Sequence, residues 1–165
     1  DGVDVDEYLA MIRGKTAVLV ELAAELGALV AGASDERVAH YAAFGLNLGL
    51  AFQMQDDILG IWGDEAVTGK SAATDITTRK KTLPVLYALP RSAELRALYA
   101  DDATDGEFVR QVVALLDETG ARQHAVGRAE QYTAGAVDAL AAAGPAEPAA
   151  AALAQLTAML LRRDY

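Results

Sequence analysis

Cysteine is absent from this sequence and proline is scarce, with four Pro among 165 residues. The lack of cysteine excludes disulfide bonds, thiolate chemistry and cysteine-based metal sites. The scarcity of proline, with a hydrophobic content of 53% that is rich in alanine, favours helices. A chain of this length is sufficient for one domain with a real core, so we predict a single all-α domain.

Basic residues are outnumbered, which gives a formal net charge of −10. This charge argues against nucleic acid as a partner, because phosphate backbones are bound by basic surfaces. Long hydrophobic runs are also lacking: charged or amide residues interrupt every run before the roughly eighteen residues of a membrane-spanning helix. The start, DGVDVDEYL, is not a signal peptide. We expect a cytoplasmic protein with no integral membrane segment.

The most informative stretch runs from Phe52 to Leu89. Adjacent carboxylates, Asp56 and Asp57, stand at the end of a long apolar helical pattern, and a polar segment containing Lys70 and Lys80 follows. Carboxylates hold Mg²⁺ together with phosphate oxygens, and lysines act as point charges on phosphate. The pattern therefore suits a site that binds an oligophosphate through metal ions.

Helical spacing supports this interpretation. Residues three or four apart share a helix face, and this spacing links Gln53, Asp56, Asp57, Gly60 and Asp64. Two adjacent acids alone equally describe a solvated helix end. The ordered combination of a glutamine, two aspartates, a Gly-Lys pair, an aspartate and Lys-Lys-Thr-Leu-Pro is much rarer by chance.

The segments FQMQDDILG, GDEAVTGK and TDITTRKKTLPVLYAL resemble the second aspartate-rich region of the trans-prenyl diphosphate synthases. The resemblance implies an all-α bundle of the isoprenoid synthase type. It also implies a Mg²⁺-dependent prenyltransferase that condenses isopentenyl diphosphate with an allylic diphosphate. Weaker periodic similarity continues over the whole chain.

The resemblance further implies roles for individual side chains. Asp56 and Asp57 would bind the metal, and Gln53 would lie beside the reacting carbons. Lys15 and Thr16, which follow a glycine in an otherwise apolar helix, would contact the allylic diphosphate, although a surface lysine is the alternative. The implied substrate-binding residues are Lys15, Thr16, Phe52, Gln53, Lys70 and Lys80, with catalytic roles for Lys15, Gln53, Lys70 and Lys80; Phe44 and Leu48 would line the pocket.

The chain departs from the family pattern at several positions. Gly60 replaces the third acid of the usual DDxxD motif, as in some members that also carry a following Trp-Gly-Asp. Either the loss is tolerated, so that Gly60→Asp restores a carboxylate without affecting the fold, or glycine is needed there for space. Ala73 and Arg79 stand where the family often has glycine.

The first aspartate-rich motif of the family is absent from the sequence. We therefore expect residues 1–165 to be the C-terminal portion of a single helical domain, with the N-terminal half supplied upstream or by another chain. The isolated portion should expose an apolar patch and be inactive, and the complete enzyme is expected to be a homodimer.

Three alternatives stay open at this point. The chain can be a noncatalytic subunit of a prenyl synthase, a terpene cyclase on the same scaffold, or a structural helical bundle.

Gly45 and Gly49, one turn apart in a helix, predict a close approach by another helix or by substrate. The expected helices span residues 4–31, 35–62, 82–89, 93–100, 105–119, 121–143 and 148–163, with a long connection over 63–81.

Overall fold

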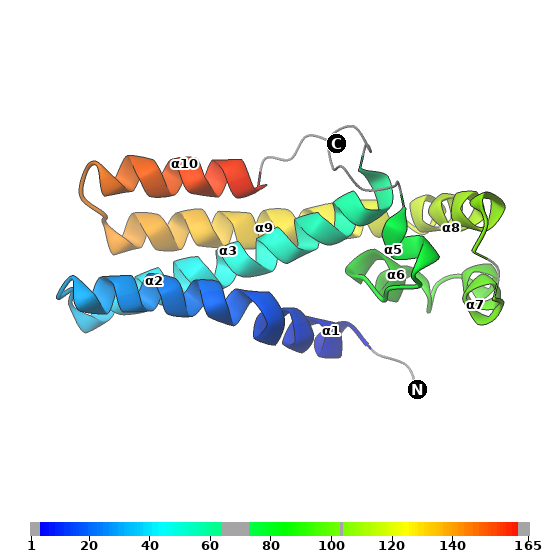
Figure 1. Ribbon diagram of the computed structural model, residues 1–165, viewed down its shortest axis with the longest axis horizontal. Coiled ribbons are helices and arrows are strands. Elements are labelled where there is room, and N and C mark those ends of the chain that lie inside the picture. The colour runs from blue at the N-terminus through cyan, green and yellow to red at the C-terminus, as the bar shows by residue number, and fades with distance from the viewer. Residues whose placement is uncertain (1–3, 64–72, 103, 162–165) are drawn as a thin grey trace. The chain divides into compact units, whose positions relative to one another are not determined.

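The computed structural model describes residues 4–63, 73–102 and 104–161, and every regular element within these ranges is helical. The all-α prediction is therefore confirmed. None of the helices in the described ranges is long and apolar enough to cross a membrane. The elements are α1 (Val5–Ile12), the π-helical turn η1 (Arg13–Ala17), α2 (Val18–Val30), α3 (Asp35–Trp62), α5 (Thr74–Thr77), α6 (Leu83–Ala88), α7 (Ala93–Ala100), α8 (Gly106–Glu118), α9 (Ala121–Ala143) and α10 (Ala149–Leu161) (Figure 1).

Local signals explain most helix boundaries. Asp4 and Glu7 form the predicted capping box, in which each backbone N–H donates to the other side chain, at 3.1 and 2.9 Å. Asp105 caps α8 by accepting from the Phe108 N–H at 2.9 Å. Two expectations differ from the structure. The first predicted helix is interrupted by η1, and the 63–81 connection contains the short helix α5.

The chain divides into two compact units, and α3 and α9 each contribute to both. The first unit holds the residues up to Leu9 and those from Met54 to Gly127. Its core joins the end of α3 to α5, α6, α7 and α8. The innermost side chains are Ile76, Val85, Leu95, Phe108, Val112 and Leu116, all at most 2% exposed.

The second unit holds residues Ala10–Gln53 and those from Arg128 onward. Phe44 and Leu48, which we expected to line a substrate pocket, are both buried in the core that α3 shares with α9 and α10, and their role toward a substrate stays a prediction. The predicted close approach at Gly45 and Gly49 is confirmed. A Cβ at Gly45 would lie 2.5 Å from the Val20 carbonyl oxygen, and one at Gly49 would lie 2.6 Å from the Cα of Ala17.

Candidate active site

The two adjacent carboxylates at the end of α3 lie in different environments. Asp57 is 1% exposed, whereas Asp56 is only partly buried. Successive residues in an α-helix point about 100° apart, so one side chain turns inward while its neighbour stays near solvent. The expected shared helix face of Asp56 and Asp57 is therefore divided between the interior and the surface, and Asp64 lies outside the described residues.

Asp57 is held by two donors inside the first unit. Its Oδ2 accepts a hydrogen bond from the Tyr8 hydroxyl at 2.7 Å, and its Oδ1 accepts from Lys80 Nζ at 2.9 Å. Lys80 also donates to Asp75 Oδ2 at 2.9 Å. Asp57 and Lys80, two of the predicted site residues, are thus brought together. Tyr8 was not among the predicted site residues, because no motif marks its position.

The charges in this cluster shift two pKa values. Burial, reinforced by the negative charge of Asp57 and its hydrogen bond, raises the pKa of Tyr8. For Lys80, burial alone lowers the pKa, but hydrogen bonds to Asp57 and Asp75 outweigh it and raise the pKa above its ordinary value. At neutral pH the phenol is therefore neutral and the lysine is charged.

Gly60 packs directly against the carboxylate of Asp75. A Cβ at position 60 would lie 2.5 Å from Oδ2 and 2.7 Å from Cγ of Asp75, so any side chain there displaces that carboxylate. An aspartate at position 60 would therefore require the Asp75 side chain to move, and the effect of Gly60→Asp on the fold stays a prediction. The contact favours the alternative that glycine at this position provides space.

Two departures from the family pattern coincide with left-handed backbone at the ends of α5. Ala73 has φ 59° and Arg79 has φ 52°, a conformation that glycine adopts without steric cost. The side chain of Arg79 offsets the steric cost of its left-handed backbone. Its guanidinium donates to the Leu98 carbonyl at 3.0 Å and lies 4.6 Å from the ring centroid of Phe108. These contacts connect the end of α5 to α7 and α8.

In the second unit, the unusual Arg-Gly-Lys-Thr segment forms η1. A π-helical turn is rare and is often associated with a functional site. Thr16 Oγ1 donates to Gln53 Oε1 at 3.0 Å, so the structure brings together two more predicted residues. Lys15 is exposed, and Phe52 is partly buried against the core. Lys70 lies outside the described residues.

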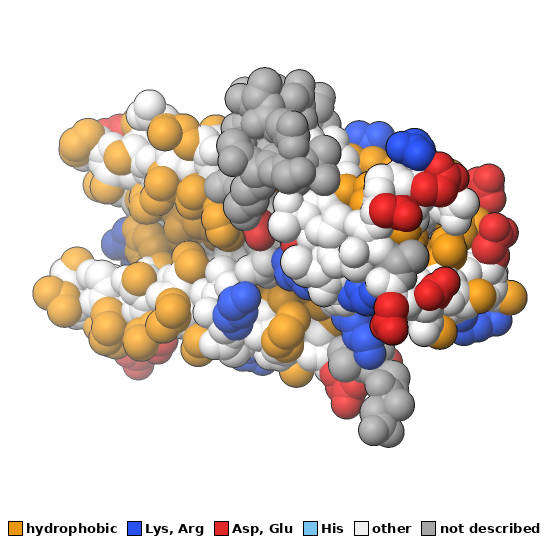
Figure 2. Space-filling model, turned by 45° about the vertical axis from the view of Figure 1, so that its right-hand side comes forward, with side chains coloured by type: hydrophobic (Ala, Val, Ile, Leu, Met, Phe, Trp, Pro, Cys, Tyr) orange, Lys and Arg blue, Asp and Glu red, His pale blue; other side chains and the backbone are white. Residues whose placement is uncertain are grey.

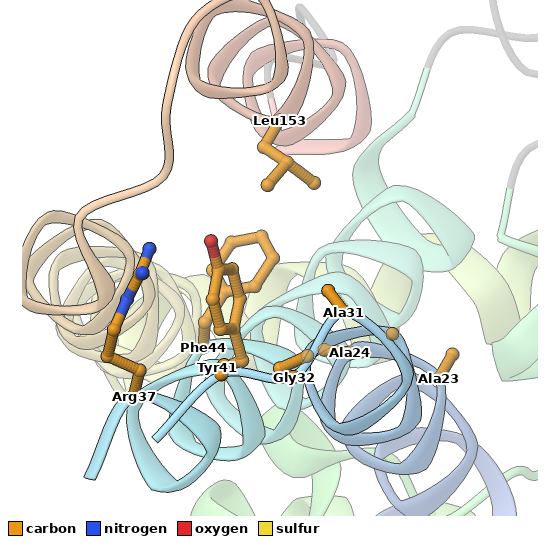
Figure 3. Close-up of a pocket in the computed structure, with 11 residues that line it drawn as sticks. Ala23, Ala24, Ala31, Gly32, Arg37, Tyr41, Phe44 and Leu153 are labelled. Atoms are coloured by element: carbon orange, nitrogen blue, oxygen red, sulfur yellow. The ribbon is translucent and has the colours of Figure 1, made fainter. Parts of the chain in front are cut away.

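A pocket of about 380 Å³ also lies in the second unit, between α2, α3 and α10 (Figure 3). Phe44 lines it from α3, and Leu153 points toward it from α10. The Arg37 guanidinium donates to the carbonyls of Ala143 and Gly144, at 2.9 and 2.8 Å. No carboxylate is among the described lining residues, so this pocket offers no ligands for a metal-bound diphosphate.

The donor set at the end of α3 fits a hard cation only in part. Within the described ranges, no group of three or more His, Asp or Glu side chains is arranged to hold a metal ion. Mg²⁺ is nevertheless often bound by one or two carboxylates together with phosphate oxygens. The residues present fit a metal ion that a diphosphate helps to hold.

Comparison with known proteins identifies the class to which this fold and site belong. The sequence profile of polyprenyl synthetase matches residues 1–116. The chain belongs to the polyprenyl synthetase family. The resemblance found in the sequence is thereby confirmed.

Individual relatives agree with this assignment. The chain is 45% identical to geranylgeranyl diphosphate synthase of Mycobacterium tuberculosis, over 84% of this chain and 41% of that protein. It is 41% identical to geranylfarnesyl diphosphate synthase of Aeropyrum pernix, over 84% of this chain and 44% of that protein. The chain thus spans less than half of these curated relatives.

A solved structure agrees as well. The crystal structure of geranylgeranyl pyrophosphate synthase from Corynebacterium glutamicum, complexed with calcium and isoprenyl diphosphate, matches with a TM-score of 0.82 and 36% identity. The match covers 96% of this chain and 50% of that chain.

Proposed function

We propose that the chain is part of a prenyltransferase that condenses isopentenyl diphosphate with an allylic diphosphate to give a longer trans-prenyl diphosphate. The observation that carries this proposal is the ion-paired Asp57 and Lys80, beside Asp56, at the end of α3 in a polyprenyl synthetase. The relatives' names support the reaction class. Because they differ in product, from geranylgeranyl to geranylfarnesyl diphosphate, they leave the chain length open.

Asp56 and Asp57 are proposed to bind Mg²⁺ jointly with the diphosphate of the allylic substrate. The Corynebacterium relative, which was crystallised with calcium and isoprenyl diphosphate, supports a divalent cation as part of such a site. The bound cation would supply electrostatic stabilisation of the departing diphosphate. Lys80, with Lys15 and Lys70, would place further positive charge on its oxygens as the allylic cation forms.

Gln53 and Thr16, which both lie in the second unit, are proposed to contact the substrate. Their mutual hydrogen bond, 3.0 Å from Thr16 Oγ1 to Gln53 Oε1, fixes the orientation of the Gln53 amide. An oriented amide oxygen can face the positive charge that develops on the reacting carbons. Phe52, beside Gln53 on α3, would help to exclude water that would quench the cation.

A row of exposed apolar side chains supports the proposal that an N-terminal half covers this chain. Side chains that are at least 40% exposed recur at helical spacing along α1 and α2, and Figure 2 shows hydrophobic side chains gathered over the second unit. So many exposed apolar side chains indicate an interaction surface. We infer that its occupant is the helical segment present in the longer relatives, with homodimerisation still a prediction. The row comprises Met11, Val18, Leu19, Leu22, Leu26, Leu29 and Val30.

Substrate dependence tests the proposed reaction. The complete protein, meaning this chain joined to an N-terminal half, is supplied with an allylic diphosphate with and without isopentenyl diphosphate. Diphosphate release that requires both substrates supports condensation. A hydrocarbon or alcohol formed from the allylic substrate alone would instead identify a cyclase, and absence of turnover would indicate a noncatalytic subunit.

Metal binding tests the site itself. Calorimetry should detect Mg²⁺ binding to the chain only when inorganic pyrophosphate is present, and Asp56→Ala should abolish it. Unchanged binding by Asp56→Ala would remove Asp56 from the site.

A further inference from the structure

The positions of Asp57 and Lys80 depend on residues outside the proposed ligand set. Asp57 is almost fully buried, and a buried carboxylate is tolerated only when it is paired and hydrogen-bonded. Tyr8 satisfies one carboxylate oxygen at 2.7 Å, and Lys80 satisfies the other at 2.9 Å. These hydrogen bonds fix the orientation of the Asp57 carboxylate, and they also fix the positions of the Tyr8 hydroxyl and the Lys80 ammonium group.

Lys80 is fixed in turn by a second carboxylate. Its Nζ lies 2.9 Å from both Asp57 Oδ1 and Asp75 Oδ2, while its side chain stays 36% exposed. An ammonium group has three N–H donors, and these two contacts use two of them. Among the residues that the structure describes, the third donor has no partner, so it can meet a phosphate oxygen in a direction that the two carboxylates determine.

Asp75 occupies this position directly against residue 60, which has no side chain. A Cβ there would lie 2.5 Å from Asp75 Oδ2, far inside van der Waals contact. The backbone offers little relief, since α5 is bounded by the left-handed residues Ala73 and Arg79 and since Arg79 is anchored to the Leu98 carbonyl. Gly60 and Asp75 are therefore sterically interlocked.

We propose that Tyr8 and Asp75 are positioning residues that aim the Lys80 ammonium at a bound diphosphate, and that Gly60 provides the space in which Asp75 does so. This inference rests on the proposed function for the identity of the ligand. The interlock of Gly60 with Asp75 is independent of that function, because it follows from the packing alone.

A double-mutant cycle, measured by thermal unfolding, tests whether Gly60 and Asp75 are interlocked. The 165-residue chain and its variants Gly60→Ala, Asp75→Ala and the double variant are unfolded by heat. Gly127→Ala is the matched control, because Gly127 lies in helix α9 of the same unit and its Cβ would meet no described atom within 4 Å. Gly127→Ala should raise the melting temperature and Gly60→Ala should lower it. In the Asp75→Ala background, Gly60→Ala should lose most of its effect; equal effects in both backgrounds would overturn the interlock.

Binding of inorganic pyrophosphate with Mg²⁺, measured by calorimetry on the folded proteins, tests the positioning role. Removing a negative charge near an anion should strengthen binding if Asp75 acts through charge alone. Positioning predicts the opposite: Asp75→Asn weakens binding at least tenfold, and so does Gly60→Ala, which changes no charge. Tighter binding by Asp75→Asn, or unchanged binding by Gly60→Ala, would overturn the positioning role. If the complete protein, meaning this chain joined to an N-terminal half, binds no pyrophosphate, the proposed function and the positioning role both fail. Coupling between Gly60 and Asp75 in the thermal unfolding of the variants would still support the interlock.

Discussion

Replacing Tyr8 with phenylalanine isolates one hydrogen bond to a buried charge. The ring remains and only the hydroxyl is lost, so packing is preserved while Asp57 Oδ2 loses its donor. A hydrogen bond to a charged group contributes about 1.5–3 kcal/mol. Because both residues are only 1% exposed, water cannot readily replace the lost donor. We expect Tyr8→Phe to lower the free energy of unfolding by about 2 kcal/mol.

Tyr99 provides a matched control in the same unit. Its buried hydroxyl has no hydrogen-bond partner among the described atoms. Removing an unsatisfied buried hydroxyl is neutral or stabilising, so Tyr99→Phe should leave the free energy of unfolding unchanged or slightly higher. Urea unfolding at pH 7, monitored by circular dichroism, gives the free energy of unfolding of each variant. The comparison requires that the slope of this free energy against urea concentration is the same for all the proteins. Equal unfolding midpoints for the two variants would refute the reasoning.

The pH dependence has a defined sign. Burial and the charge of Asp57 raise the pKa of Tyr8 above its ordinary value of 10.0. Since the unfolded chain releases this proton at lower pH than the folded chain, the contribution to stability is complete below about pH 10 and is lost as the pH rises further. Lys80, whose pKa is also raised, acts in the same direction. The stability gap between wild type and Tyr8→Phe should therefore narrow above pH 10.

Further substitutions test other parts of the structure. Gly49→Ala should lower the free energy of unfolding by about 1–3 kcal/mol, because the added methyl group overpacks against η1. The control is Gly27→Ala, which adds a methyl group in open space on α2 and should raise the free energy of unfolding by up to about 1 kcal/mol in the same urea assay. Ala73→Gly should relieve left-handed strain and leave the thermal midpoint unchanged or higher; a clear decrease would contradict the strain. Replacing Leu22 and Leu26, which are 46% and 48% exposed, with serine should reduce binding of an apolar dye to the isolated chain with little loss of helical signal.

Most of the helical framework was predictable because its signals are local. Capping at Asp4 and Asp105 depends on residues three positions apart, and Gly45 and Gly49 reported a close helix contact before its partner was known. The π-helical turn η1 was not predicted. The unusual Gly-Lys-Thr segment marked its location but not its hydrogen-bonding pattern.

The site was predictable only where a motif identified it. The aspartate-rich region marked both Asp57 and Lys80, and the structure joins them in an ion pair that was not predicted. Their roles toward metal and diphosphate stay predictions. Tyr8 contacts Asp57 across 49 positions of sequence, and no local pattern encodes such a pairing. The contact between Gly60 and Asp75 likewise depends on how α5 folds back onto α3, so the sequence left open whether glycine was tolerated or required.

Chain elongation by a chimeric protein tests the central claim most directly. In the chimera, this chain replaces the matching portion of the Mycobacterium tuberculosis geranylgeranyl diphosphate synthase, whose N-terminal half remains. We predict Mg²⁺-dependent elongation of an allylic diphosphate by isopentenyl diphosphate in the chimera, its loss in the Asp56→Ala chimera, and no elongation by residues 1–165 alone. Robust elongation by the isolated chain, or a folded chimera that elongates nothing, would contradict the account.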